Sequence, residues 1–311
     1  MIHFFTAAGE RAKVKRALEL KLSPKTLKRL SRDREALKMP SATRVMSFLA
    51  CRIRGFDAIA ESLDRDPAGL TKLSRCTLTP LIQAVLDRQG TIDRMAPDGF
   101  TAFFNAPLED NRHASHACEC ALATMLALEK ANRDLEHVTF DGVPMGPVGI
   151  GIGVSTGPGI VGDFGTDHVP HFTVASRASQ HASELERLSA DYGTSILVAE
   201  STRAAAESEF AFLEIDALRT RSGDREPLHA LVGTPVSRAN PKFLALKAFH
   251  ERIFEAYRAK EWGKARELIE QCRGLSGANP VLYDFYLKRI SHLESDPSGA
   301  DWGVRLEPSA A

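Results

Sequence analysis

The feature that most restricts the fold is a pair of short apolar runs separated by a turn. Residues 90–95 and 100–104 have the composition of strands, and a Pro-Asp-Gly sequence occupies 97–99 between them. This pattern predicts a β-hairpin, and a hairpin requires antiparallel strands. Helical and strand-like segments mix along the rest of the chain, so we expect an α+β fold.

The other elements follow from hydrophobic periodicity and from turn residues. Helices are expected at residues 11–38, with a break at the Ser-Pro of 23–24, and at 70–88, 112–135, 178–190 and 242–292. Strands are expected at 45–51, 148–154, 159–164, 172–174, 196–198, 210–215 and 227–232. Residues 155–158 (STGP) predict a turn that joins two of these strands as a pair. The glycine-rich segment 149–153 lies within a strand and no helix follows it, so we interpret it as close backbone packing rather than a phosphate loop.

Composition restricts the class of protein. The chain has 311 residues, of which 43% are hydrophobic and 26% charged, and its formal net charge is zero, so nucleic acid is not an expected partner. Basic residues prevail in 1–40, which we interpret as a solvated helical face; contact with an anionic membrane is the alternative. No run of about 18 apolar residues occurs, so no transmembrane segment is expected. The five cysteines do not have the spacing of a disulfide framework, which indicates reduced thiols and a cytoplasmic location.

The order of the motifs resembles that of bacterial class III adenylate/guanylate cyclases, in particular the cytoplasmic part of those with an extracellular sensor. The matching segments are residues 22–38, 53–56 (IRGF), 90–107 (GTIDRMAPDGFTAFFNAP), 149–165 (GIGIGVSTGPGIVGDFG), 172–185 (FTVASRASQHASEL), 214–216 (EID), 225–227 (REP) and 301–304 (DWGV). The resemblance implies a class III cyclase homology domain, with a ferredoxin-like core of antiparallel sheet and packed helices. We expect the sensor and its membrane spans to be absent.

Four parts of the chain are expected. Residues 1–42 form a helical lead-in and residues 43–234 the cyclase homology domain. Residues 235–295 form a helical tail that is similar to one tetratricopeptide unit, which cannot make a solenoid alone and therefore packs on the main domain. Residues 296–311 are a loose C-terminus.

The resemblance also implies a metal site. In the family, two carboxylates hold two metal ions, which activate the ribose 3′-oxygen and neutralise the triphosphate. Their positions are occupied here by Arg52 and Asp98. A guanidinium cannot ligate Mg²⁺, so only Asp98 is retained as a metal ligand. We therefore expect no cofactor, and Mg²⁺ or Mn²⁺ only if some activity remains.

Other functional positions of the family carry unlike residues. They are Gln180 and Glu184 at the transition-state positions, Ser222 and Asp224 in the phosphate-binding stretch, and Arg94 and Arg177 at the base-reading positions. Glu184 places negative charge where a negative phosphorane must form. Arg177 replaces a hydrogen-bond acceptor with a donor. The resemblance thus implies a degenerate catalytic site.

Three hypotheses for function remain open. The leading one is a catalytically inactive or impaired cyclase-like protein of cyclic-nucleotide signalling, which acts by forming a homodimer, or a heterodimer with another cyclase domain, or by binding a nucleotide. The second is an active, divergent adenylate cyclase that makes cyclic AMP from ATP. The third is a nucleotide or polyphosphate sensor that uses Arg52, Arg94 and Arg177.

A zinc site is a further possibility on the helix expected at 112–135. His113, His116 and Cys120 fall on one face of the helix expected at 112–135 and have the donor atoms that zinc prefers. In the family that the chain resembles, the corresponding helix is an ordinary surface helix without metal. We therefore interpret the three residues as part of that helix.

Overall fold

The computed structural model describes residues 18–32, 41–136, 139–140, 143–144, 146–166, 168–219, 224–275, 277–295 and 304–305. They fall into two compact units, one within Met1–Ile150 and Val154–Ser183, the other within Gly151–Gly153 and Glu184–Ala311. Within the described residues, no helix combines the length and the apolar character needed to cross a membrane.

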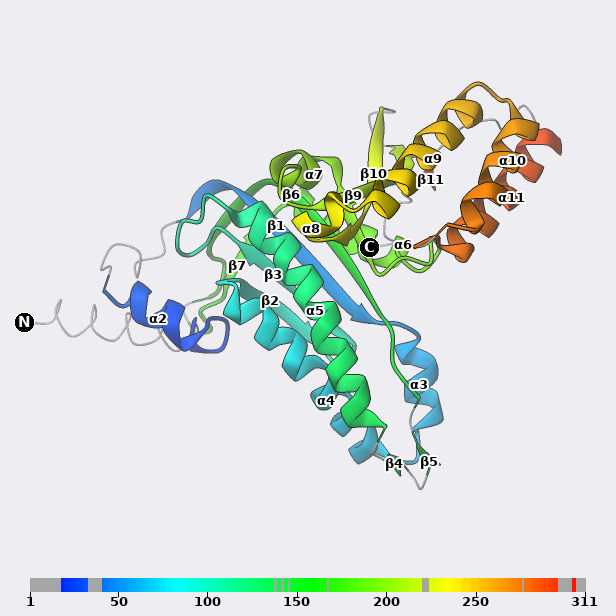
Figure 1. The fold of residues 1–311 in the computed structure, drawn as a ribbon. Helices are drawn as coiled ribbons and strands as arrows, with labels where there is room; N and C mark the ends of the chain where they lie inside the picture. The colour runs from blue at the N-terminus through cyan, green and yellow to red at the C-terminus, as the bar shows by residue number, and fades with distance from the viewer. Residues whose placement is uncertain are drawn as a thin grey trace, which may run out of the picture. The chain divides into compact units, whose positions relative to one another are not determined.

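The first unit is an α+β layer structure. Its strands are β1 (Ala42–Ile53), β2 (Thr91–Ala96), β3 (Gly99–Phe104), β4 (Thr139–Phe140), β5 (Val143–Pro144), β6 (Ile150–Asp163) and β7 (Phe172–Ala175). Its helices are α2 (Pro24–Leu30), α3 (Phe56–Ser62), α4 (Pro67–Asp87), α5 (His113–Leu135) and the start of α6 (Arg177–Leu188). The sheet order is β6-β1-β3-β2, with β7 beside β6, and α4 and α5 run side by side against it (Figure 1).

Local sequence signals explain several boundaries. Ser23 is the N-cap of α2, where its hydroxyl accepts from the Thr26 N–H at 3.1 Å, and Pro24 takes the first helical position as predicted. Asp66 caps α4 in the same way, accepting from the Gly69 N–H at 2.8 Å. The hairpin around 97–99 is confirmed, since β2 and β3 pair antiparallel on either side of it. Helix α3 was not expected.

The prediction of two paired strands in 148–164 is wrong. The structure has one continuous strand, β6, which runs through the STGP sequence. Each half has a different neighbour: Ile152 N–H donates to the Ser195 carbonyl at 2.8 Å, whereas 160–163 pair antiparallel with β7. Both halves therefore have a backbone partner without a turn between them.

The second unit combines sheet and helices. Its strands are β8 (Ile196–Ala199), β9 (Ala211–Arg219), β10 (Arg225–Gly233) and β11 (Val304–Arg305), in the order β11-β9-β10-β8. Its helices are α7 (Glu200–Ala206), α8 (Pro235–Arg238), α9 (Pro241–Arg258), α10 (Trp262–Arg273) and α11 (Pro280–Ser295). Strand β10 pairs antiparallel with β8 and β9, whereas β11 is parallel to β9. The sheet is therefore mixed.

The interpretation of the glycine-rich segment is confirmed at Gly151. A Cβ added there would lie 2.5 Å from Ser189 Oγ and 2.9 Å from the Glu186 carbonyl, so only glycine lets helix and strand approach this closely.

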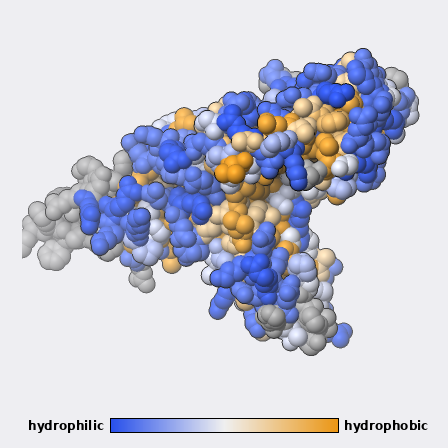
Figure 2. Space-filling view, viewed as in Figure 1, coloured by the Kyte–Doolittle hydropathy of each residue, from blue (hydrophilic) through white to orange (hydrophobic). Residues whose placement is uncertain are grey.

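Each unit has its own apolar core. The core of the first unit includes Met46, Phe48, Phe103 and Phe172, and that of the second includes Leu213, Phe254, Leu268 and Tyr286. Figure 2 shows a largely hydrophilic surface with smaller hydrophobic areas. Exposed apolar side chains include Val236 of α8 and Leu244 of α9.

Candidate functional site

The end of β1 and the β2–β3 turn bring two of the predicted site residues together. Strands β1 and β3 pair antiparallel, with Arg52 opposite Gly99, and the Ile53 N–H donates to the Asp98 carbonyl at 2.7 Å. A Cβ on Gly99 would lie 2.2 Å from the Cys51 carbonyl oxygen, so glycine is required for this close approach. The register therefore holds Asp98 beside Arg52.

The side chains of these two residues form an ion pair. Arg52 Nη1 lies 3.1 Å from Asp98 Oδ2, with 57% and 21% of the respective side chains exposed. A guanidinium has hydrogen-bond donors and no acceptor, so it cannot share a metal ion with the carboxylate. Its positive charge also compensates Asp98 and repels a cation from the same place. These residues do not fit the two-metal arrangement that the resemblance implies.

Arg94 lies beside a different carboxylate, that of Asp93. Arg94 Nε is 3.5 Å from Asp93 Oδ2, and the Asp93 side chain is almost fully buried. The Thr173 hydroxyl donates to Asp93 Oδ1 at 2.5 Å, and the Lys21 ammonium donates to the Asp93 backbone carbonyl at 2.7 Å. Burial lowers the pKa of Lys21, and the Asp93 charge opposes that effect.

The sequence analysis did not single out Asp93 as a buried carboxylate with partners. The only signal was a carboxylate inside an apolar strand, where a charge is expected to have partners. Its partners are Lys21, which precedes α2, and Thr173 on β7, and both are distant along the chain.

The remaining predicted positions that the structure describes lie on α6 and directly before β10. Arg177 begins α6 and is exposed, as is Gln180 one turn later. Glu184 is half-buried on the same helix and belongs to the second unit, as does exposed Asp224, which directly precedes β10. Ser222 lies outside the described residues. Of the predicted site residues, Arg52 and Asp98 form an ion pair with each other, and Arg94 pairs with Asp93.

The three residues considered for zinc make separate contacts. His113 Nδ1 is hydrogen-bonded to Ser47 Oγ at 2.9 Å, and His116 Nδ1 lies 2.7 Å from Asp110 Oδ2. Burial raises the pKa of the Cys120 thiol to about 12, which disfavours the thiolate that a metal needs. In the described part of the chain, no three His, Cys, Asp or Glu side chains are grouped as metal ligands.

Curated proteins with similar sequences are cyclases. The chain is 36% identical over 115 residues to "Adenylate cyclase 1" of Rhizobium meliloti (strain 1021), covering 37% of this chain and 16% of that protein. It is 29% identical over 162 residues to "Adenylate cyclase" of Anabaena cylindrica, covering 52% and 30%. The chain thus spans less than a third of the length of either relative. No family model matches the sequence.

Solved structures with a similar fold are also cyclases. The guanylyl cyclase Cya2 aligns with a TM-score of 0.56 at 23% identity, covering 63% of this chain and 95% of that one. The adenylyl cyclase CyaB from P. aeruginosa aligns with a TM-score of 0.54 at 22% identity, covering 62% and 96%. At this identity, the likeness shows the fold. The chain thus has the α+β fold of cyclase homology domains, with a mixed sheet and packed helices. Part of it is also similar in sequence to adenylate cyclases.

Proposed function

We propose that this chain is a cyclase-like protein that does not turn over nucleoside triphosphates and that acts by pairing with cyclase domains. The observation that carries the proposal is the Arg52–Asp98 ion pair, 3.1 Å long, at the place where the resemblance implies two metal-binding carboxylates. Two metal ions supply the Lewis acid and the activated nucleophile of such a reaction. A guanidinium supplies charge but neither of these two functions.

The other unlike residues support the same proposal. The resemblance assigns transition-state stabilisation to the positions of Gln180 and Glu184, and a carboxylate there opposes the developing negative charge. The base-reading positions carry Arg94 and Arg177. A cyclase fold that has lost turnover can still associate with other cyclase domains.

A turnover assay tests the proposal. Purified protein is incubated with ATP or GTP and with Mg²⁺ or Mn²⁺, and we expect neither cyclic AMP nor cyclic GMP. The matched control is Asp98→Ala, which removes the retained carboxylate. Product that scales with protein and disappears in this control would establish the second hypothesis, an active divergent adenylate cyclase, which the names of the two curated relatives favour.

A nucleotide or polyphosphate sensor is the third hypothesis. Exposed Arg94 and Arg177 favour it, whereas the pairing of Arg52 with Asp98 weakens it. Calorimetric titration with ATP, GTP and pyrophosphate, without metal and at low salt, distinguishes it from the main proposal, because electrostatic binding of a polyanion is strongest under those conditions.

A further inference from the structure

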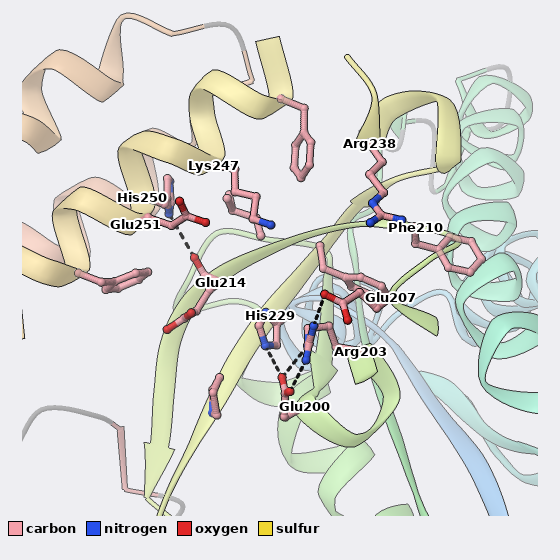
Figure 3. Close-up of a pocket in the computed structure, with 15 residues that line it drawn as sticks. Glu200, Arg203, Glu207, Phe210, Glu214, His229, Arg238, Lys247, His250 and Glu251 are labelled. Atoms are coloured by element: carbon pink, nitrogen blue, oxygen red, sulfur yellow. Dashed lines mark hydrogen bonds and ion pairs between the residues drawn. The ribbon is translucent and has the colours of Figure 1, made fainter. Parts of the chain in front are cut away.

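A cavity of about 340 Å³ lies within the second unit. Its lining residues belong to other elements than those that carry Arg52 and Asp98. Strands β9 and β10 and helix α7 line one side of it, and α9 lines the other (Figure 3). Its size is within the range of pockets that hold small molecules. Nothing in the resemblance to cyclases gives it a role.

The floor of the cavity is a closed polar network. Glu200 accepts hydrogen bonds from Arg203 Nε at 2.8 Å and lies 2.7 Å from His229 Nε2. Burial of Glu200 raises its pKa, and the bonds from Arg203 and His229 more than offset this, so its pKa is lowered and it stays ionised. Arg203 also pairs with Glu207 at 2.9 Å. These groups satisfy one another and leave little charge for a ligand.

The rim of the cavity offers charge of both signs. Lys247 and Glu251 are one helical turn apart on α9 and both face the cavity (Figure 3). Arg238 Nη1 donates a hydrogen bond to the Ser208 carbonyl at 2.8 Å, which leaves other N–H donors of its guanidinium for a ligand. Glu214 pairs with Arg258 through Oε1 at 2.9 Å and has a second oxygen. Burial raises the pKa of Glu214.

This arrangement favours a ligand that carries charge of both signs. With Arg258, which pairs with Glu214, four cationic side chains balance the four carboxylates of the lining, so a polyanion such as a nucleoside triphosphate would find no excess of positive charge. A ligand with one positive and one negative group would instead find a partner for each. Four phenylalanines complete the lining, which suits an apolar body.

We propose that this cavity binds a free amino acid with an apolar side chain. Its carboxylate lies against Lys247 and Arg238, its ammonium against Glu251 and Glu214, and its side chain among the phenylalanines. The proposal is independent of the proposed function, because neither the cavity nor its lining uses the residues of the Arg52–Asp98 site.

Calorimetric titration of the full chain with L-leucine and with L-phenylalanine tests the proposal. We expect saturable binding of at least one of them. N-acetyl-leucine lacks the ammonium and leucinamide lacks the carboxylate, so each should bind at least about tenfold more weakly than leucine, since each loses a charge-assisted hydrogen bond. The same comparison with the corresponding phenylalanine derivatives applies if phenylalanine is the ligand.

Variants on α9 locate the site. Lys247→Met and Glu251→Gln should each weaken binding at least about tenfold, and both residues are exposed, so the fold should tolerate the changes. Lys242→Met and Glu255→Gln are matched controls on the same helix outside the cavity lining, and should leave binding unchanged. No saturable binding, equal binding of a capped derivative, or equal loss in the control variants would each overturn the proposal.

Discussion

Arg52 determines what the end of β1 can bind. Arg52→Asp would place a second carboxylate beside Asp98, because the β1–β3 register puts residue 52 opposite Gly99. It would also change the local charge by two units. We expect Mn²⁺ to bind this variant at least about tenfold more tightly than the natural chain, since carboxylates are the preferred ligands of hard divalent cations. Calorimetry or electron paramagnetic resonance of added Mn²⁺ measures the change.

Arg52→Ala is the matched control for this prediction. It removes the cation without adding a ligand, so its Mn²⁺ affinity should remain below that of Arg52→Asp. Equal affinity in the two variants would mean that relief of repulsion, rather than a carboxylate pair, explains the gain. No gain in either would mean that the hairpin does not present Asp98 to a metal.

His250 makes the folded state sensitive to acid. Its ring is buried, Nδ1 lies 3.3 Å from the Glu214 carbonyl, and Nε2 lies 3.0 Å from the Tyr283 hydroxyl. The carbonyl only accepts, so Nδ1 donates to it and Nε2 accepts from Tyr283. Burial lowers the pKa of His250 from 6.5 to about 4, and the bond to Glu214 opposes this. The unfolded chain therefore takes up the proton at higher pH than the folded chain does.

Stability should consequently fall as the pH drops from 6.5 to about 4. The difference between the two pKa values of His250 corresponds to a loss of roughly 3 kcal/mol in the free energy of unfolding over this window. Burial lowers the pKa of His229 as well, so the total decrease includes a second contribution. Urea unfolding of the natural chain and of His250→Gln at a series of pH values gives the two slopes. The slope should be smaller in His250→Gln, whereas exposed His168→Gln should keep the natural slope; equal slopes in all three would contradict the prediction.

At the scale of residues, the resemblance to a family was informative where closeness along the chain was not. The resemblance assigned Arg52 and Asp98 to one site, and the register brings their side chains together. Asp93 could not be assigned a partner, because Thr173 is 80 residues away along the chain. Pairwise contacts of that kind depend on tertiary packing, which periodicity does not encode.

Helix α11 is anchored to strand β9 by a buried ion pair. Arg289 donates two hydrogen bonds to the two oxygens of Asp216, at 3.0 and 2.6 Å, and the Tyr192 hydroxyl donates to Asp216 at 2.5 Å. Asp216 is completely buried. Arg289→Met would leave this carboxylate without its cation, which costs roughly 3–5 kcal/mol for a buried pair. Urea unfolding monitored by circular dichroism should show a decrease of this size.

The Arg266–Glu294 pair provides the control. It joins α10 and α11 with an N–O distance of 2.6 Å, but both side chains are more than a third exposed. Arg266→Met should therefore lower the unfolding free energy by less than about 1 kcal/mol. Equal losses in Arg266→Met and Arg289→Met would show that burial does not set the strength of these pairs.

At the scale of elements, local signals predicted most of the structure. Caps and prolines placed α2, the hairpin turn placed β2 and β3, and the 3.6-residue period placed α4 and α5. The prediction of a turn at 155–158 failed because Gly and Pro also occur in strands whose backbone has other partners. Pro158 illustrates this, since its carbonyl accepts from the Ser176 hydroxyl at 2.8 Å. Helix α3 was missed because seven residues are too few for a periodic signal.

At the scale of the whole molecule, the cyclase fold and the substitutions that the resemblance implies have a joint consequence. The resemblance implies that two cyclase domains pair head to tail and that each of two sites takes its metal carboxylates from one domain and its base-reading and transition-state residues from the other. The resemblance implies changes in both sets, with Arg52 at a metal-carboxylate position and Gln180 and Glu184 at the transition-state positions. Under the proposed function, a mixed dimer with an intact cyclase would therefore contain no complete site.

Co-expression with an intact cyclase of the same subfamily should then lower cyclic nucleotide output in proportion to the amount of this chain. Exchange of subunits would convert active homodimers into mixed dimers, and the loss should follow the mixed fraction, because association obeys mass action. Co-purification measures pairing, an immunoassay measures the cyclic nucleotide, and an empty vector controls for expression load. Pairing with undiminished or raised output would refute inhibition while preserving the dimer. If the chain pairs neither with itself nor with any such cyclase, the premise of association fails. The fold must then be retained for another reason, and ligand binding in the cavity between α9 and strands β9 and β10 is the first candidate.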